Sequence, residues 1–242
     1  MSSQTRNSIE FEVHGRYALF TDPLTRIGGE KCSYQLPTYE ALKGIVKSIY
    51  WKPSLIWIVD EIRVMNRMQT QTKGTKPQEF GGGNTLAIYT FLKDVKYQVR
   101  AHFEWNEHRP ELAADRVEGK HHTIANRMLE RGGRQDIFLG TRDCQGYVVP
   151  CTFGTGQSVW ESTGELSFGL MFHGFDYPDE TGDPMLHSRF WHQKMTNGVV
   201  QFPRPEKCEI RKAIRNLTMK KFGVTQNLLS VDDEYLALEG IA

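Results

Sequence analysis

The sequence predicts an α+β fold, with a ferredoxin-like first half and a small antiparallel β-sheet in the second half. In the first 145 residues, hydrophobic patterns typical of strands and helices follow one another in the order β-α-β-β-α-β. That order is the split β-α-β arrangement, which RNA-recognition domains also use. After that point only strand patterns follow. With 242 residues, the chain is long enough for two small domains, and we expect them at residues 1–145 and 146–242.

The first strand and the first helix have clear signals. Ile9, Phe11 and Val13 alternate with polar residues, which is typical of a half-buried strand. Thr38 stands where a helix N-cap is expected, and Pro53 ends the helical pattern. Between them, apolar residues repeat at helical spacing: Leu42, Ile45, Val46, Ile49 and Tyr50.

The rest of the first half is predicted to contain three more strands, a second helix and one loop. Residues 55–59 are almost continuously apolar, which predicts a buried strand, and residues 97–105 alternate over a longer one. Residues 66–84 are polar and basic and end in three glycines, so we expect a long mobile loop. A second helix is predicted over about 119–131, with a glycine pair as its stop, and a fourth strand over 136–141.

The second half carries the pattern of a small antiparallel sheet. Residues 166–172 alternate, and the segments 187–195 and 199–202 flank Asn197-Gly198, a strong signal for a two-residue hairpin turn. The chain then ends in an acidic tail around Asp232-Asp233-Glu234. We therefore expect the second domain to be a β-sheet followed by this tail.

Composition excludes several classes of protein. No stretch approaches the roughly 18 consecutive apolar residues of a membrane span, and the first residues lack the apolar segment of a secretory signal. The four cysteines are widely spaced without a Cys-x-x-Cys pair, which favours reduced thiols over a disulfide framework or a zinc site. A cytoplasmic protein with no membrane association is expected.

The net charge of +1 hides two basic segments. Residues 62–100 and residues 201–221 each carry seven Lys or Arg against two acids. Such segments indicate a surface for a polyanion, although two solvated faces balanced by acids elsewhere would give the same count. The side chains that we expect to contact nucleic acid are Arg63, Arg67, Lys73, Lys76 and Arg204.

Three candidate catalytic residues are brought together by the predicted topology. In a ferredoxin-like fold the two helices lie antiparallel on one face of the sheet, so the end of the first helix lies near the start of the second. Tyr50 ends the first helix, and Lys120 and His121 begin the second. The alternative is that Tyr50 is an aromatic residue at the edge of the core and the other two are solvated.

A phenol, an ammonium and an imidazole can together cleave RNA without a metal ion. The ribose 2′-hydroxyl attacks the adjacent phosphate, a base takes its proton, an acid protonates the leaving 5′-oxygen and a cation offsets the phosphorane charge. Unperturbed Tyr and Lys titrate near ~10 and His near ~6.5. His121 is therefore the natural proton carrier, Lys120 the phosphate clamp, and Tyr50 orients the hydroxyl or acts as base if a cation lowers its pKa.

No cofactor or metal site is predicted. His102 and Glu104 share a face of a strand, but no third metal ligand is well placed. The glycines at 81–83 lack the Lys-Ser/Thr ending of a phosphate-binding P-loop.

Eleven ordered segments form a recognisable pattern that spans residues 17 to 205: 17–25 (YALFTDPLT), 27–31 (IGGEK), 37–39 (PTY), 41–44 (ALKG), 48–53 (SIYWKP), 81–87 (GGGNTLA), 118–121 (EGKH), 136–140 (DIFLG), 144–147 (CQGY), 177–182 (YPDETG) and 201–205 (QFPRP). In these segments the chain closely resembles the CRISPR-associated Cas-five family, subtype d (the Dvulg or type I-C form), of the RAMP superfamily.

The resemblance implies a RAMP ferredoxin-like, RRM-like domain followed by a small β-sheet domain. It also implies a metal-independent endoribonuclease that cuts the repeat hairpin of precursor crRNA, leaving a 5′-hydroxyl and a 2′,3′-cyclic phosphate. The family's Tyr, Lys and His of the SIYWKP and EGKH motifs fall on Tyr50, Lys120 and His121. Members then stay with the mature crRNA in the type I-C surveillance complex, beside its backbone and large subunits. The glycine-rich loop of RAMP proteins is degenerate here, over 154–164.

Two other functions remain open at this point. A non-catalytic subunit would only hold the 5′ handle of the crRNA, as other subtypes of the family do, and the complete Tyr/Lys/His trio distinguishes this chain from it. A general binder of double-stranded DNA would also use the basic segments. Competition between a repeat hairpin and duplex DNA separates that function from RNA binding, whereas salt dependence does not, because counterion release accompanies both.

Overall fold

A computed structural model describes residues 7–22 and 29–218. The predicted acidic tail lies outside the described residues, as does part of the second basic segment. No helix in the described ranges is long and apolar enough to cross a membrane.

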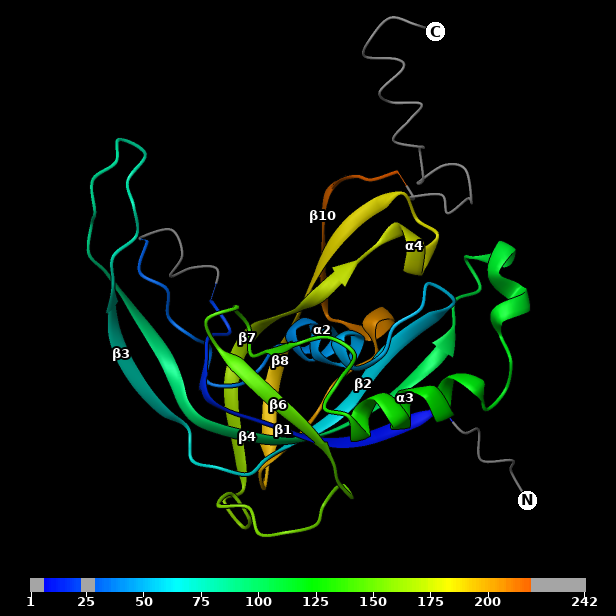
Figure 1. The fold of residues 1–242 in the computed structure, drawn as a ribbon, viewed down its shortest axis with the longest axis horizontal. Helices are drawn as coiled ribbons and strands as arrows, with labels where there is room; N and C mark the ends of the chain where they lie inside the picture. Colours follow the sequence, from blue (N-terminus) through cyan, green and yellow to red (C-terminus); the bar gives the residue numbers. More distant parts are fainter. Residues whose placement is uncertain (1–6, 23–28, 219–242) are drawn as a thin grey trace, which may run out of the picture.

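The predicted ferredoxin-like sheet is present. Four antiparallel strands lie side by side in the order β2-β4-β1-β6, so the first strand lies between the third and fourth strands of the core (Figure 1). Their inward-facing side chains are apolar and buried, and they join one hydrophobic core. The four strands are β1 (Ser8–Ala18), β2 (Leu55–Val64), β4 (Ala87–Trp105) and β6 (Gln145–Pro150).

Both predicted helices form and pack against this sheet. Helix α2 (Tyr39–Ile49) begins where Thr38 Oγ1 accepts a hydrogen bond from the Ala41 amide, and buries its apolar stripe against β2. Helix α3 (Lys120–Glu130) starts after Gly119, whose φ of 73° places it in the left-handed region that favours glycine. The end of α2 lies next to the start of α3, as the topology predicts.

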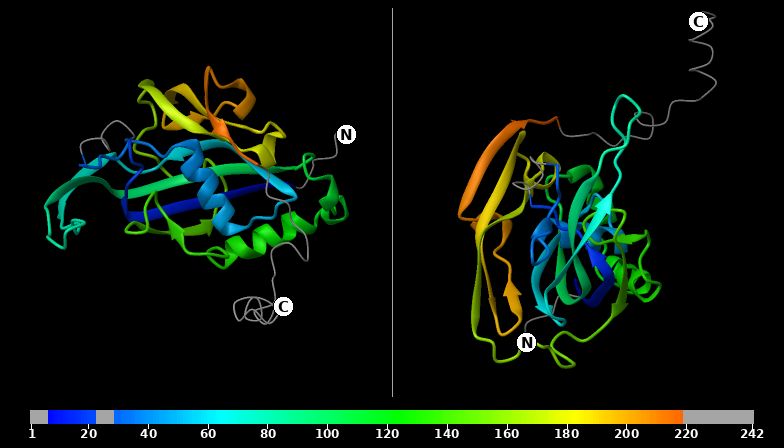
Figure 2. Two further views of the ribbon diagram at one scale, coloured as in Figure 1. Left: turned by 90° about the horizontal axis from the view of Figure 1, so that it is seen from above. Right: turned by 90° about the vertical axis from the view of Figure 1, so that its left-hand side faces the viewer.

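The prediction of a mobile loop over residues 66–84 is wrong for the part that forms a strand. Residues Gln69–Thr75 form β3, which pairs with the first residues of β4, and the two strands make an arm that projects from the body (Figures 1 and 2). β3 is a run of Gln, Thr and Lys with mostly exposed side chains, so no apolar face marks it as a strand. Cross-strand hydrogen bonds to β4 hold it in place instead.

The fourth core strand lies further along the chain than predicted. At 136–141 only Ile137–Phe138 (β5) is extended, and the chain turns at Gly140 before β6 pairs with β1. A Cβ on Gly140 would lie 2.0 Å from the Leu19 carbonyl oxygen, so this close crossing requires glycine. β6 thus begins at the boundary expected between the two domains, and that division stays a prediction.

The second half extends the same sheet. The predicted hairpin turn at Asn197-Gly198 joins β8 (Met185–Thr196) to β9 (Val199–Gln201), and β9 pairs with β2. The full strand order is β10-β8-β9-β2-β4-β1-β6-β5, with β7 paired to β8. The remaining strands and short helices are β7 (Glu165–Asp176), β10 (Ile210–Asn216), α4 (Pro178–Thr181), η1 (Pro110–Asp115) and η2 (Pro205–Lys207).

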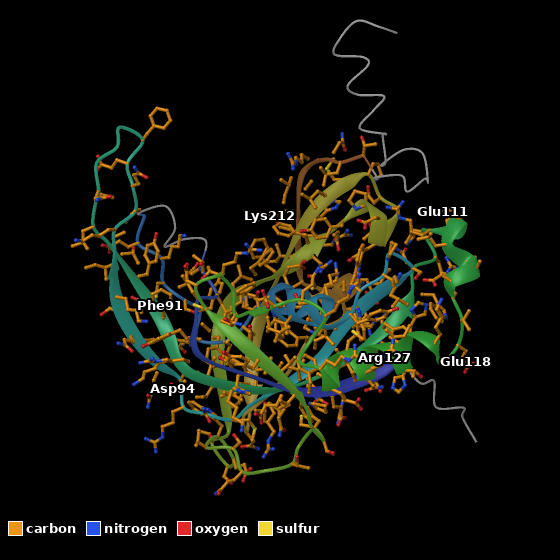
Figure 3. The ribbon with its side chains drawn as sticks, in the orientation of Figure 1. Phe91, Asp94, Glu111, Glu118, Arg127 and Lys212 are labelled. Atoms are coloured by element: carbon orange, nitrogen blue, oxygen red, sulfur yellow. The ribbon has the colours of Figure 1, made fainter. Side chains whose placement is uncertain are left out.

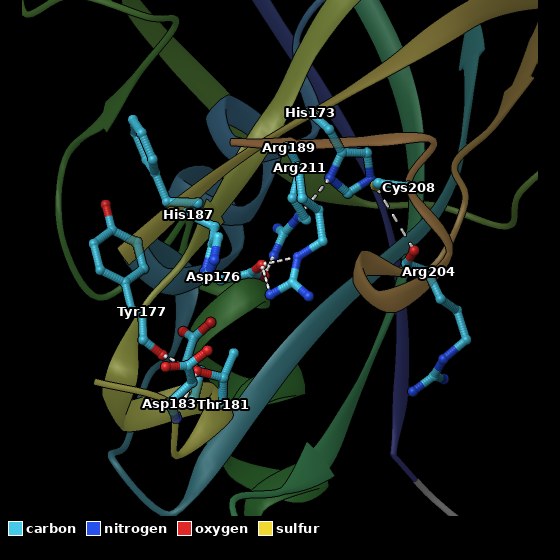
Figure 4. Close-up of polar contacts among 12 residues, drawn as sticks. His173, Asp176, Tyr177, Thr181, Asp183, His187, Arg189, Arg204, Cys208 and Arg211 are labelled. Atoms are coloured by element: carbon cyan, nitrogen blue, oxygen red, sulfur yellow. Dashed lines mark hydrogen bonds and ion pairs between the residues drawn. The ribbon is translucent and has the colours of Figure 1, made fainter. Parts of the chain in front are cut away.

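A buried charged cluster links β7, β8 and β10 (Figure 4). Asp176 accepts hydrogen bonds from Arg189 and, at 2.6 and 2.9 Å, from the Arg211 guanidinium. Arg189 also donates to His173 Nδ1 at 3.4 Å. Burial and the Arg189 charge lower the pKa of His173 to about 3, so this imidazole is neutral at ordinary pH.

Candidate active site

The three predicted catalytic residues meet where α2 ends and α3 begins. Tyr50 is the C-cap of α2, and its hydroxyl lies 2.8 Å from His121 Nδ1. Lys120 and His121 are the first two residues of α3. The predicted convergence of the two helix ends is therefore confirmed by a direct contact between their side chains.

The hydrogen bonds of His121 assign its protonation. Its Nε2 lies 2.7 Å from the backbone carbonyl oxygen of Asp115, which can only accept, so Nε2 carries the proton. In the neutral imidazole Nδ1 is then the basic nitrogen, and it accepts a hydrogen bond from the Tyr50 hydroxyl. His121 thus presents the nitrogen that can take a proton, Nδ1, to the Tyr50 hydroxyl.

Asp115 belongs to this site, and sequence reasoning missed it. Its carboxylate accepts from Lys120 Nζ at 2.6 Å and from Ser54 Oγ at 2.7 Å. Burial acts to raise the pKa of Asp115, but these hydrogen bonds hold it below its usual value, so the carboxylate is ionised. Asp115 lies at the end of η1, in a segment without hydrophobic periodicity, and no pattern in the sequence marks it.

The site is closed in this state. His121 has no exposed surface and Tyr50 is 2% exposed, whereas the Lys120 side chain is 43% exposed. Burial and the Asp115 charge raise the pKa of Tyr50. In this closed state a tyrosinate at position 50 is therefore disfavoured, which favours a role of Tyr50 in orienting the 2′-hydroxyl.

A basic cavity of about 550 Å³ lies beside the end of α2, and sequence reasoning did not identify it. Of its described lining residues, three are cations and none is an acid, but Lys47 Nζ is paired with Glu180 at 2.9 Å, so Lys52 and Arg134 carry its positive charge. Arg134 is anchored there because its amide donates to the Ser48 and Ile49 carbonyl oxygens. The lining residues are Lys47, Trp51, Lys52, Pro53, Arg134 and Gln135. Such a lining suits a phosphate backbone that passes the site.

Two of the predicted RNA contacts are already engaged within the protein. Arg63 is 7% exposed, and its guanidinium donates to the Thr155 and Gly156 carbonyl oxygens at 3.0 Å and to Glu161 at 2.5 Å. The sequence suggests no acidic partner for it, because Glu161 is distant along the chain, and Arg63 is left out of the RNA surface. Arg204 pairs with both carboxylate oxygens of Glu104 at 2.9 Å, so its charge is largely offset.

The other three predicted contacts lie on or near the arm. Arg67 and Lys76 are exposed, and the Lys73 ammonium sits 3.2 Å from the Tyr17 ring centroid. Phe91 on the arm and Glu118 beside the active site are at opposite ends of the molecule (Figure 3). Lys73 pairs with Tyr89 and the trio lies beside Trp105, so the path between them along β4 is about 50 Å at about 3.3 Å per residue.

The strand residues weighed as metal ligands have other partners. His102 Nδ1 lies 2.9 Å from Asp60 Oδ2, and Glu104 is held by Arg204. Within the described residues, no group of three His, Cys, Asp or Glu is placed to hold a metal ion.

Comparison with known proteins assigns the family. The model of the family described as CRISPR-associated protein (Cas_Cas5), subtype Cas5d, matches residues 8–203. Two curated relatives are both named "CRISPR pre-crRNA endoribonuclease Cas5d". The one from Mannheimia succiniciproducens is 25% identical over 224 residues (81% of this chain, 95% of the relative), and the one from Thermus thermophilus is 24% identical over 230 residues (84% and 94%).

Two solved structures have a similar fold. A crystal structure of a CRISPR-associated protein superposes with a TM-score of 0.72 at 36% identity, covering 85% of this chain and 96% of that one. The functionally uncharacterized protein SMU1763c from Streptococcus mutans gives 0.71 at 37% identity, with the same coverage. The fold agrees with a family model that matches most of the chain, and this chain belongs to the Cas5d family of CRISPR-associated proteins.

Proposed function

We propose that this protein is a metal-independent endoribonuclease that cleaves the repeat hairpin of precursor crRNA. The observation that carries the proposal is the contact between Tyr50 and His121 beside Lys120, because these groups supply what RNA transesterification needs. Membership of the Cas5d family, whose two curated relatives are named as pre-crRNA endoribonucleases, supports the same substrate.

The reaction is a transfer of phosphate from the 5′-oxygen to the neighbouring 2′-oxygen. The 2′-oxygen forms its bond to phosphorus while its proton passes to His121 Nδ1, directly or through the Tyr50 hydroxyl. The bond to the 5′-oxygen breaks, and that oxygen takes a proton that the His121 imidazolium returns through a water molecule, so the protein ends in its starting protonation state. The products are a 2′,3′-cyclic phosphate and a 5′-hydroxyl, and the Lys120 ammonium offsets the charge that builds on the phosphorane.

The scissile phosphate takes the place of the Asp115 carboxylate. In the RNA-free protein this carboxylate accepts hydrogen bonds from the Lys120 ammonium and the Ser54 hydroxyl, as an anionic phosphate oxygen would. Asp115 ends η1, a segment without buried residues, so little packing opposes its displacement. The departure of its side chain opens the closed site, while its backbone carbonyl stays on His121 Nε2, so Nδ1 remains the basic nitrogen.

The cleaved RNA stays bound as the mature crRNA. The basic cavity beside Tyr50 and the arm provide two separate surfaces for its backbone, and we assign the protein to the type I-C surveillance complex on the basis of its family. Duplex DNA is a weaker candidate ligand, and a competition assay between the repeat hairpin and duplex DNA decides between them.

Cleavage in the presence of EDTA tests the proposed reaction. Purified protein incubated with its cognate repeat RNA and EDTA should cut at one position and leave 5′-hydroxyl and 2′,3′-cyclic phosphate ends. The readout is end-group analysis of the products. Loss of cleavage in EDTA with recovery in Mg²⁺ or Mn²⁺ would overturn this mechanism.

The arm is expected to contribute to affinity and not to chemistry. Replacing Arg67, Lys73 and Lys76 together with Ala should weaken binding of the repeat RNA. The slope of log affinity against log salt should fall by about 0.7–0.9 for each RNA phosphate that the variant no longer neutralises. The single-turnover rate of saturated protein should not change, because these residues are far from the trio along β4.

A matched control for the arm is Lys194→Ala, which removes an exposed lysine from the β8 hairpin. It should leave the salt slope as in the wild type. If the arm variant also keeps the wild-type slope, these lysines and arginines face away from the RNA.

A further inference from the structure

A second cavity, of about 320 Å³, opens beside the start of α3. It lies against the trio, because Gly119 directly precedes Lys120 and the Trp105 ring contacts His121. Its volume and its mix of aromatic and polar walls are those of a site for a small ligand. Besides Phe103, the wall is formed by Asn7, Glu104, Trp105, Arg116, Glu118 and Gly119.

Two neighbouring rings fix the aromatic wall. Trp105 is the last residue of β4 and is half-buried. Its ring centroid lies 5.5 Å from that of His121 at 73°, and 5.7 Å from that of Phe103 at 60°. An indole held in this way is preorganised for stacking, which is how proteins hold unpaired bases of RNA.

The polar wall offers one donor, the buried Arg116 Nε, which has no partner among the described residues, and several hydrogen-bond acceptors. Arg204 holds the pKa of Glu104 below its usual value, so its carboxylate is ionised and can only accept. Each of its two oxygens accepts one hydrogen bond from Arg204 and can accept another. Glu118 adds a second carboxylate at the rim, and Asn7 Nδ2 donates to the Phe103 carbonyl oxygen at 2.8 Å, which leaves its own oxygen as an acceptor. Acceptors of this kind pair with the amino groups of guanine, adenine or cytosine, whereas uracil has no amino group and offers only its N3–H as a donor.

We propose that this cavity binds one nucleobase that carries an amino group, from a nucleotide flanking the scissile phosphate, with Trp105 as its stacking platform. The inference rests on the proposed function, since the cavity lies against the trio. A base that turns out of the RNA strand and binds in this cavity would hold the adjacent phosphate at Lys120 and His121. Trp105 and Glu104 thereby determine which nucleotide is presented for cleavage.

The test compares intact repeat RNA with RNA that is abasic at either nucleotide flanking the scissile phosphate. All of these RNAs carry 2′-deoxyribose at the cleavage position, so that they bind without being cut. Their affinities are measured for the wild-type protein and for the Trp105→Ala and Trp105→Phe variants. One of the two abasic sites should weaken binding roughly 5- to 150-fold, the range given by the loss of one stacked base. Uracil at that position should bind more weakly than a base with an amino group.

The variants distinguish stacking from a structural role of Trp105. Trp105→Ala should weaken binding of intact RNA by the same factor as the abasic site, with little further loss on abasic RNA. Trp105→Phe should retain most of the affinity. If Trp105→Ala weakens binding of intact and abasic RNA equally, or if neither abasic site changes affinity, the base site does not exist. Failure of the proposed function would appear separately, as an absence of cleavage of intact ribose RNA by the wild type.

Discussion

His121→Gln is expected to reduce the single-turnover rate of repeat cleavage by about 10²–10⁴-fold, the usual contribution of general acid–base catalysis. Glutamine can still donate to the Asp115 carbonyl oxygen, but it cannot take a proton from the 2′-hydroxyl. Because His121 is fully buried, thermal melting should be recorded with the rate, to show that the variant is folded. Hairpin affinity should stay within about tenfold of the wild type.

Substitutions of the other two residues of the trio should also lower the cleavage rate. Lys120→Ala removes the cation that stabilises the phosphorane, and loss of such a group typically costs about 10²–10³-fold. Tyr50→Phe keeps the ring in the core and removes only the hydroxyl that contacts His121. If Tyr50→Phe cleaves like the wild type, Tyr50 is only an aromatic residue at the edge of the core.

The neighbouring histidine provides the matched control for His121. His122 turns away from the site, and its Nε2 lies 3.1 Å from the Ser8 carbonyl oxygen. His122→Gln should leave the cleavage rate near that of the wild type. Equal losses in His121→Gln and His122→Gln would indicate general damage to α3 and would count against a catalytic role for His121.

Asp176→Ala is expected to lower the free energy of unfolding by about 3–5 kcal/mol, because it leaves a buried arginine without its counter-ion. The carboxylate of Asp176 is 5% exposed and binds both Arg189, which is 2% exposed, and Arg211 (Figure 4). For a chain of this size each kcal/mol lowers the melting temperature by roughly 2–4 °C. Calorimetry or urea unfolding measures the change.

The control is an exposed ion pair on the same hairpin. Glu165 and Lys194 are 56% and 57% exposed and lie 3.0 Å apart. Glu165→Ala should change stability by less than about 1 kcal/mol, as exposed pairs do. If Asp176→Ala is no more damaging than Glu165→Ala, the buried cluster does not hold β7, β8 and β10 together.

The sequence was sufficient to place the trio because topology determines where helix ends meet. The spacing of apolar residues located α2 and α3, and the split β-α-β order then brought Tyr50 near Lys120 and His121. Burial of the site and the role of Asp115 could not be predicted in the same way. They depend on how residues 106–119 fold over the helix ends, and that segment has no periodic pattern.

Strands that are stabilised by their neighbours were also hard to predict. β3 has no apolar face, so its hydrogen bonds to β4 are visible only in three dimensions.

Arg63 was interpreted as part of a basic segment, but β2 extends to Val64 and places this residue against Glu161. A count of charges along the sequence cannot distinguish a buried arginine with a distant partner from an exposed one.

The most direct test of the central claim replaces a single oxygen atom of the substrate. A repeat RNA with 2′-deoxyribose only at the nucleotide 5′ to the scissile phosphate lacks the nucleophile and keeps the hairpin and all phosphates. We expect the wild-type protein to bind this RNA with the affinity of the all-ribose repeat and not to cut it. Cleavage of the 2′-deoxy substrate at the same position, with a 3′-hydroxyl end, would mean that water attacks the phosphate and would contradict the mechanism assigned to Tyr50, Lys120 and His121.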